Sequence, residues 1–310
     1  MLTKLLILGA YFAVLFLIGI VASRKVKGLS DYYVGGKQVG FWAASFSARA
    51  TGESGWLLLG LTGMGALAGV SAFWVVLGEL LGVGVSWFFM AKRFKRMTDE
   101  YGAITIPDFL EGRFQPKTHR LRSIAATALS VFVIIYVSAQ IDTTGKAFES
   151  LLDMNYFVGA LLGFGIVLAY IFLGGFLAAV WSDVFQGLMM FFGLLLLPII
   201  AWFSIDSGSA FVSGLRTIDP GLLNIWGTHE DPWMNVFTIL GFAMIGLGFL
   251  GSPQIYVRFI AIKNEAEITK GRWVALAFTL LTDSAAVSIG LLGRYLYSES
   301  GVDPTVVFGN

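Results

Sequence analysis

Long apolar stretches, separated by shorter polar segments, repeat along the whole chain of 310 residues. A helix needs about 20 mostly apolar residues to cross the hydrocarbon core of a bilayer, and eight stretches reach that length. No linker or low-complexity region divides them, so the pattern predicts one all-helical membrane domain over residues 1–310. The eight predicted spans are 4–22, 40–66, 70–91, 124–145, 156–180, 184–204, 236–260 and 273–297.

The composition agrees with a membrane protein and narrows the chemistry. Hydrophobic residues make up 56% of the chain and charged residues 13%, whereas soluble domains carry about 25% charged residues. The net charge of +1 gives no field that would attract nucleic acid. The chain has no Cys, its two His are far apart, and it shows no nucleophile–base set or phosphate loop. These features argue against an enzyme and against a thiolate or histidine metal site.

Lys and Arg are distributed unevenly among the polar segments. Segments 23–39, 92–122 and 258–272 hold 16 of the 21 basic residues, and eight spans threaded in order place all three segments on one side. The positive-inside rule makes that side cytoplasmic and puts the N-terminus outside. Span 4–22 is expected to be an uncleaved helix, because its basic cluster follows the apolar run and no A-x-A site ends it.

A polar segment interrupts the second span. Within "SARATGESGW", residues 47–56, Arg49 and Glu53 are four residues apart, so a continuous helix would pair them on one face. The two glycines of "TGESG" disfavour an unbroken helix, and irregular backbone at membrane depth is tolerated where it is buried or lines a cavity. A discontinuous helix frees carbonyl groups that can bind a cation. The segment is compatible with a plain salt bridge and with a broken-helix site.

Span 236–260 carries a second interruption. Gly246, Gly248, Gly251 and Pro253 fall within eight residues, which indicates either a second broken helix or a simple proline kink. This span is the sixth, counted from the first interrupted one, and broken first and sixth helices are typical of the LeuT-type inverted repeat. The interpretation gives a leading helix at 4–22, a first five-helix repeat over about 40–204, and the start of a second repeat at about 236–297.

Ionisable side chains inside spans are hypotheses for function, because they are costly in lipid. Glu79 is either a hydrogen-bonding residue in helix packing or part of a site, and Asp283 is a further candidate. Asp142 and Tyr136 lie in the polar stripe "YVSAQIDTTG", which predicts the wall of a wet cavity. Asp183 is expected at a short cytoplasmic turn between two spans, as a helix N-cap or as a functional residue.

Four motifs occur in order along the chain: "SGWLLLGLTG", "IPDFLEGRF", "FLGGFLAAVWSDVFQ" and "GLGFLGSPQIYVRFIA". With them the chain resembles the sodium/solute symporter family from the N-terminus to about residue 297, and within that family the bacterial sodium/proline symporters. The resemblance implies the LeuT-type fold, about thirteen spans, and coupling of sodium entry to the uptake of a small solute. It also implies that the chain, which ends with "SESGVDPTVVFGN", is truncated at its C-terminus and does not transport alone.

The resemblance assigns roles to single residues. The backbone carbonyls of Ala50 and Glu53 are expected to bind sodium, and Asp183 corresponds to an aspartate linked to sodium-dependent transport. The family's aspartate in the first broken helix corresponds here to Gly52, one residue before Glu53. The substrate-binding residues implied by the resemblance are Ser54, Gly55, Trp56, Tyr136, Phe249 and Pro253.

The function implied by the resemblance is sodium-coupled symport of proline or a related amino acid in the bacterial cytoplasmic membrane. The tryptophan and tyrosine of the family's proline pocket correspond to Ile245 and Phe249, so the pocket loses two polar groups. A sugar, sialic acid or carboxylate is therefore an alternative solute, and a sensory input module of a sensor kinase is an alternative function. The expected partners are the solute, Na+ as the only metal, and the lipid bilayer, with no organic cofactor and no nucleic acid.

Overall fold

The computed structural model describes residues 2–227, 229 and 231–298, so all of the final stretch "SESGVDPTVVFGN" except its first residue, Ser298, lies outside the described residues. The described part contains helices and connecting turns but no strand, which confirms the all-helical prediction. The chain forms two compact units, each assembled from three separated segments. Of the described residues, the first unit contains those in 2–48, 91–185 and 253–271, and the second unit those in 49–90, 186–252 and 272–298.

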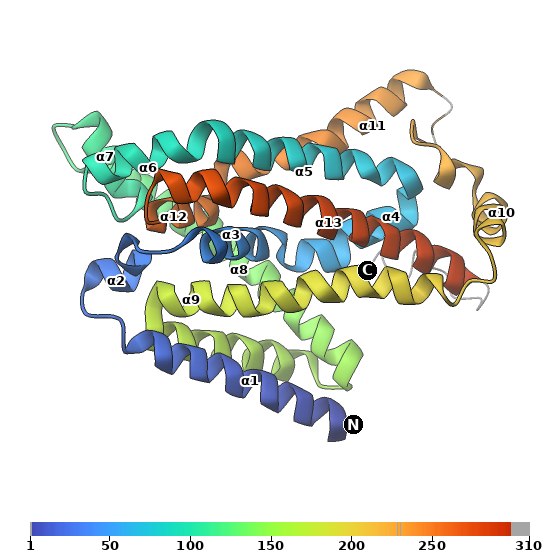
Figure 1. Cartoon of the computed structure of the whole chain (residues 1–310), viewed down its shortest axis with the longest axis horizontal. Coiled ribbons are helices and arrows are strands. Elements are labelled where there is room, and N and C mark those ends of the chain that lie inside the picture. Colours follow the sequence, from blue (N-terminus) through green and yellow to red (C-terminus); the bar gives the residue numbers. More distant parts are fainter. Residues whose placement is uncertain (1, 228, 230, 299–310) are drawn as a thin grey trace. The chain divides into compact units, whose positions relative to one another are not determined.

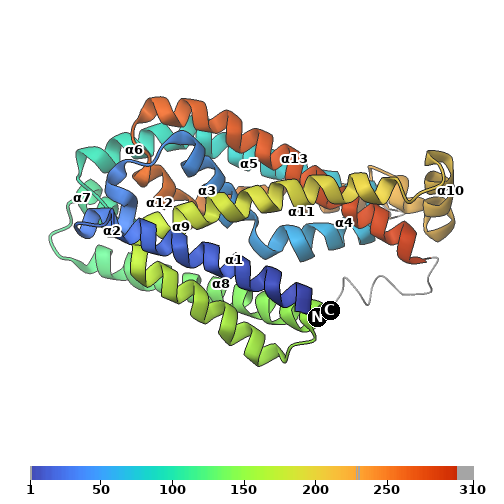
Figure 2. The same cartoon turned by 60° about the horizontal axis from the view of Figure 1, so that its bottom comes forward.

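The first unit is built around a pair of long apolar helices. Helix α1 runs beside the first half of α9 (Figure 2), where Leu15 and Ala22 pack against Tyr170 and Ala178. Gly19 lets the two backbones approach, because a Cβ there would lie 2.9 Å from the Tyr170 Cβ. The helices that lie in this unit, wholly or in part, are α1 (Leu2–Ser23), α2 (Leu29–Val34), η1 (Gly35–Lys37), α3 (Phe41–Gly55), α6 (Ala91–Glu100), α7 (Ile106–Phe114), α8 (Arg120–Leu152), α9 (Tyr156–Trp202), α12 (Pro253–Ala261) and α13 (Glu265–Ser298).

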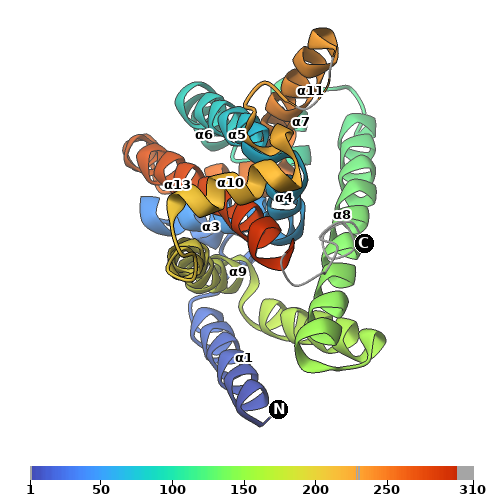
Figure 3. The ribbon, with the colours of Figure 1, turned by 90° about the vertical axis from the view of Figure 1, so that its right-hand side faces the viewer.

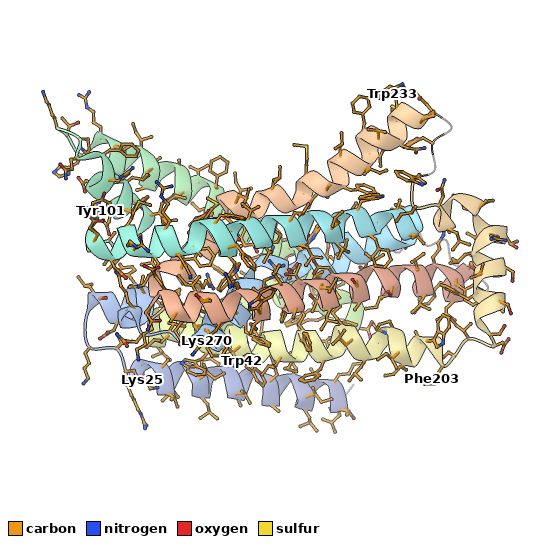
Figure 4. The ribbon with its side chains drawn as sticks, turned by 45° about the horizontal axis from the view of Figure 1, so that its top comes forward. Lys25, Trp42, Tyr101, Phe203, Trp233 and Lys270 are labelled. Atoms are coloured by element: carbon orange, nitrogen blue, oxygen red, sulfur yellow. The ribbon has the colours of Figure 1, made fainter. Side chains whose placement is uncertain are left out.

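The first two turns of α3 and of α13 are joined by hydrogen bonds within the first unit. Trp42 and Lys270, labelled in Figure 4, lie in these parts of the two helices. The Phe41 N–H donates to Glu267 Oε2 at 2.8 Å, and the Ser45 hydroxyl donates to the Gly271 carbonyl at 2.9 Å. The start of the first broken helix is therefore held against α13.

The motif "IPDFLEGRF" forms the short helix α7. The Asp108 N–H donates to the Thr105 hydroxyl at 3.2 Å, which caps the helix, and Pro107 lies in its first turn. A hydrogen bond with His119 holds the pKa of Glu111 below its usual range, and Arg122 acts in the same direction. This charged cluster belongs to the predicted cytoplasmic segment 92–122.

The second unit contains a core formed mainly by α5, the second half of α9 and α13. Its buried residues include Leu61, Val76, Leu194 and Val287. Two of its segments, η2 and η4, are π-helical. The elements of this unit, besides the remaining parts of α3, α9 and α13, are η2 (Trp56–Leu61), α4 (Thr62–Ala68), η3 (Gly69–Ala72), α5 (Phe73–Val85), η4 (Ser86–Met90), α10 (Gly208–Ile218), η5 (Pro220–Leu223), α11 (Pro232–Ile245) and η6 (Gly246–Gly251).

Helix α5 lies against α11 and η6 in close backbone contact (Figure 1). A Cβ at Gly78 would overlap the Ala243 carbonyl, and a Cβ at Gly82 would overlap the Gly246 carbonyl. Gly78 and Gly82 therefore serve helix packing, because small residues let the two backbones approach.

The η5 turn contacts both α10, which is labelled in Figure 3, and η3 in the second unit. Leu222 is buried there and its backbone covers Gly69, which has a φ of +63°. Glycine is required at this position for two reasons, since a side chain would be strained at this φ and would collide with Leu222.

Six helices in the described part are long and apolar enough to cross a membrane. Two of them, Phe41–Glu100 with 60 residues and Tyr156–Trp202 with 47 residues, each run through two of the predicted spans. A straight helix of 47 residues would extend about 70 Å, more than twice the hydrocarbon core of about 30 Å. The chain is thus a multi-pass membrane protein, and the count of eight spans stays a prediction.

The predicted turn at residues 181–183 is wrong. Helix α9 continues through these residues, and its non-helical point is Gly175, with φ 57° and ψ −144°. Glycine adopts this conformation at little cost, whereas "AVWSDVF" contains nothing that requires a turn. Asp183 is therefore inside a helix and is not an N-cap, so its functional interpretation depends on its tertiary contacts.

Candidate cation and solute site

The first predicted broken helix is confirmed. Helix α3 has a non-helical residue at Ser54, with φ 38° and ψ −142°, and the π-helical segment Trp56–Leu61 follows directly. This combination of φ and ψ is sparsely populated for a residue other than glycine; it costs about 1–3 kcal/mol, and such residues cluster at functional sites. The segment "TGESG" therefore interrupts the helix at the point that the sequence indicates.

The second broken helix is confirmed as well, and a simple proline kink is wrong. Helix α11 ends at Ile245, and the 3-10 segment Gly246–Gly251 follows. Ser252 is extended, with φ −75° and ψ 107°, and α12 begins at Pro253. Because Pro253 occupies the first position of a new helix, it removes no hydrogen bond from within one.

The predicted ion pair between Arg49 and Glu53 is present as well. Both side chains are buried, and the guanidinium contacts the Glu53 carboxylate directly. It also lies 3.9 Å from Glu79 Oε2, and its Cζ is 4.6 Å from the centre of the Phe249 ring. The salt bridge and the broken helix, which the sequence left as alternatives, therefore occur together.

Glu79 accepts a hydrogen bond, as its predicted role in helix packing requires. The Trp56 indole Nε1 donates to Glu79 Oε1 at 2.8 Å, so the predicted substrate residue Trp56 has its polar atom engaged within the second unit. Glu79 therefore links the segment after the helix break to the guanidinium of Arg49.

The ring of Phe249 leaves no room for a side chain at position 52. A Cβ at Gly52 would lie 2.8 Å from the Phe249 Cε1 atom. The ring therefore fills the space that a carboxylate at position 52 would need. The two departures from the family pattern, glycine for aspartate and phenylalanine for tyrosine, are compatible with each other in this structure.

Asp183 takes part in a hydrogen-bond network in the first unit. Its Oδ2 accepts from the Ser47 hydroxyl at 2.6 Å and from Arg258 Nη2 at 2.8 Å, and Arg258 Nε donates to the Ser47 hydroxyl oxygen at 2.9 Å. The sequence did not single out Arg258, although an arginine within "YVRFIA" was a visible signal. The network brings together α3, α9 and α12.

Asp142, which the sequence predicts to line a cavity, accepts a hydrogen bond from the Tyr156 hydroxyl at 2.7 Å. Its carboxylate also lies 3.3 Å from Lys146 Nζ.

The predicted sodium-binding and substrate-binding residues are divided between the two units. The second unit contains Ala50, Glu53, Ser54, Gly55, Trp56 and Phe249, and the first unit contains Tyr136, Asp183 and Pro253.

The chain is similar to known transporters over most of its length. The high-affinity proline transporter PutP of Bacillus subtilis (strain 168) is 38% identical over 299 residues, which cover 95% of this chain and 62% of that protein. The sodium/proline symporter of Escherichia coli (strain K12) is 34% identical over 287 residues, 92% of this chain and 56% of that protein. The chain thus spans 62% and 56% of the lengths of these two relatives.

A solved structure of a Na+-coupled sialic acid symporter, in its substrate-bound outward-open state, matches with a TM-score of 0.81 at 20% identity. The match covers 97% of this chain and 64% of that one, and it shows that the two share a fold. The family model described as the sodium:solute symporter family matches residues 32–307. On this match and on the two proline transporters, the chain belongs to the sodium:solute symporter family.

Proposed function

We propose that this protein is a symporter that couples the entry of Na+ to the uptake of proline or a closely related amino acid. The observation that carries the proposal is the helix break at Ser54, which lies in the segment that the resemblance assigns to both sodium and solute. The similarity to two proline transporters supports proline as the solute over a sugar, sialic acid or carboxylate.

Sodium would be bound by backbone oxygen atoms of the first broken helix. Ala50 lies one turn before Ser54, and Glu53 lies directly before it, so their carbonyls belong to the turn that the break interrupts. Carbonyls at such breaks bind hard cations in transporters of this architecture. The resemblance also links Asp183 to sodium-dependent transport, and its carboxylate is held by Ser47 and Arg258 within the first unit.

The solute would be recognised by a polar and an apolar group of residues. Its carboxylate would bind near Ser54 and Gly55, where the chain re-enters a helical conformation. The apolar ring of proline would contact the aromatic and proline side chains of the predicted set, namely Trp56, Tyr136, Phe249 and Pro253.

The protein would act in the bacterial cytoplasmic membrane with its N-terminus outside, because the three basic segments would then face the cytoplasm. The relatives in the comparison are transporters. We therefore propose that the protein moves its solute unchanged and catalyses no covalent reaction.

The proposal is tested by uptake of labelled proline into cells that lack their own proline transporters. The chain is joined to the remaining part of the Bacillus subtilis relative, since it spans 62% of that protein. We expect uptake in sodium medium and its loss in choline medium. Asp183→Asn should lower sodium-dependent uptake about ten-fold or more, because a carboxylate is replaced by a neutral amide.

The matched control is Asp206→Asn, since Asp206 is exposed after α9. It should leave uptake unchanged at equal amounts of protein in the membrane. Proline uptake that does not need sodium, or sodium-dependent uptake that a sugar or sialic acid inhibits better than proline, would contradict the proposal.

A further inference from the structure

The second unit contains a cluster of three buried carboxylates from three helices. Glu53 on α3, Glu79 on α5 and Asp283 on α13 each offer one carboxylate oxygen, and these oxygens all lie within 4.8 Å of one another. The exposed fractions of the three residues are 0%, 1% and 0%. Each side chain lies in a helix that is long and apolar enough to cross a membrane.

The cluster has less positive charge than negative charge. Arg49 is the cation that pairs with it among the described residues, by contact with Glu53 and at 3.9 Å from Glu79. Three carboxylates and one guanidinium leave a formal charge of −2 when all are ionised. A buried charge without a counter-charge is strongly unfavourable, and more so at membrane depth.

Several carboxylate oxygens of the cluster also lack hydrogen-bond donors. Glu53 Oε2, Glu79 Oε2 and Asp283 Oδ2 are buried, and no donor reaches them from the part of the chain that the structure describes. A buried acceptor without a donor costs about 1–3 kcal/mol, and more when it is charged. Three such oxygens on three neighbouring side chains indicate a positively charged ligand.

The other contacts of the cluster do not supply that charge. Glu79 Oε1 accepts from the neutral indole of Trp56. The Thr282 hydroxyl lies 3.1 Å from Asp283 Oδ1 but also 2.7 Å from the Phe278 carbonyl. Because a hydroxyl has one proton, it can donate fully to one of these two acceptors.

We infer that Glu53, Glu79 and Asp283 bind a hard cation of the size of Na+ or Ca2+ through their carboxylate oxygens. Ligand oxygens of such an ion lie about 2.3–2.6 Å from it, so two of them can be up to about 5 Å apart, as the oxygens of the cluster are. An all-oxygen set with negative charge suits a hard cation. This site uses side chains, whereas the proposed sodium site for transport uses the carbonyls of Ala50 and Glu53.

The inference does not depend on solute transport, and equilibrium measurements on the full chain in lipid nanodiscs test it. Thermal unfolding is followed in choline chloride, NaCl, KCl and CaCl2 at equal ionic strength, and binding of 22Na+ and 45Ca2+ is measured directly. We expect one of Na+ and Ca2+ to bind and to raise the melting temperature. Glu79→Gln and Asp283→Asn should each weaken that binding about ten-fold or more, because affinity follows the charge of the ligand set.

The controls are Glu149→Gln and Asp206→Asn, which make the same chemical changes at exposed positions and should keep the binding. Asp183→Asn should also keep it, since Asp183 belongs to the transport proposal alone. Failure of both Na+ and Ca2+ to bind the unmodified chain would overturn the inference. Binding lost in Asp183→Asn but kept in Asp283→Asn would overturn it too, while leaving the transport proposal intact.

Discussion

Replacing Arg49 with Met should destabilise the protein by about 3–5 kcal/mol, because removal of one partner leaves a buried charge uncompensated. Arg49 is the cation that pairs with Glu53 and Glu79 in the described part of the chain, and its guanidinium also lies over the Phe249 ring. Methionine replaces the aliphatic part of the arginine side chain, so the substitution removes the guanidinium with its charge and its contact with the Phe249 ring. Reversible unfolding in mixed micelles, followed by tryptophan fluorescence, measures the change in the free energy of unfolding.

Two comparisons separate the loss of this buried charge from the effect of replacing any arginine with methionine. Arg122→Met removes a half-exposed arginine that pairs with Asp108 and Glu111, and it should cost about 1 kcal/mol or less. Adding Glu53→Gln to Arg49→Met should recover part of the stability, since one buried charge is removed as well. Equal effects of Arg49→Met and Arg122→Met would show that the buried cluster does not need its guanidinium.

The second large effect is expected from a methyl group at Gly246. The Cβ of Gly246→Ala would overlap the Gly78 carbonyl, and the nearest atoms are backbone atoms that cannot rotate away. The contact between α5 and η6 would have to open, at a cost of about 1–3 kcal/mol. The same unfolding measurement detects the loss.

Gly248→Ala is the matched control, because a Cβ at Gly248 meets no atom within 4 Å. Both glycines lie in the same 3-10 segment and neither has a positive φ, so the two substitutions have similar effects on the local backbone. The expected result is a clear loss of stability for Gly246→Ala and little change for Gly248→Ala. A similar loss in both would mean that the backbone of the segment, not its packing, is sensitive.

The two helix breaks could be predicted because they depend on local properties of the chain. The "TGESG" segment and the glycines before Pro253 disfavour helix wherever the chain places them. The turn at residues 181–183 was predicted from the lengths of apolar stretches alone. Hydropathy does not show whether a helix continues, and the chain instead departs from helical geometry at Gly175.

The partners of the ionisable residues could not be predicted in the same way. Asp183 and Arg258 are 75 positions apart, and Asp283 is 230 positions from Glu53. Each acidic residue is visible in the sequence as a costly residue within a span, but the sequence does not show which acidic residues lie together. The pair Arg49–Glu53 was predictable because its spacing of four residues lies within one helix.

The π-helical segment Trp56–Leu61 gives the chain tolerance to changes in its length. A π-helical turn accommodates one residue more than an α-helical turn, so loss of a single residue here would convert it to α-helix without moving α4. The same deletion in a regular α-helical segment would instead turn one side by about 100° relative to the other, the rotation that one residue makes in an α-helix. A one-residue deletion in this segment would therefore keep the side chains on both sides of it facing as they do now, because the wide turn already holds one residue more than an α-helical turn.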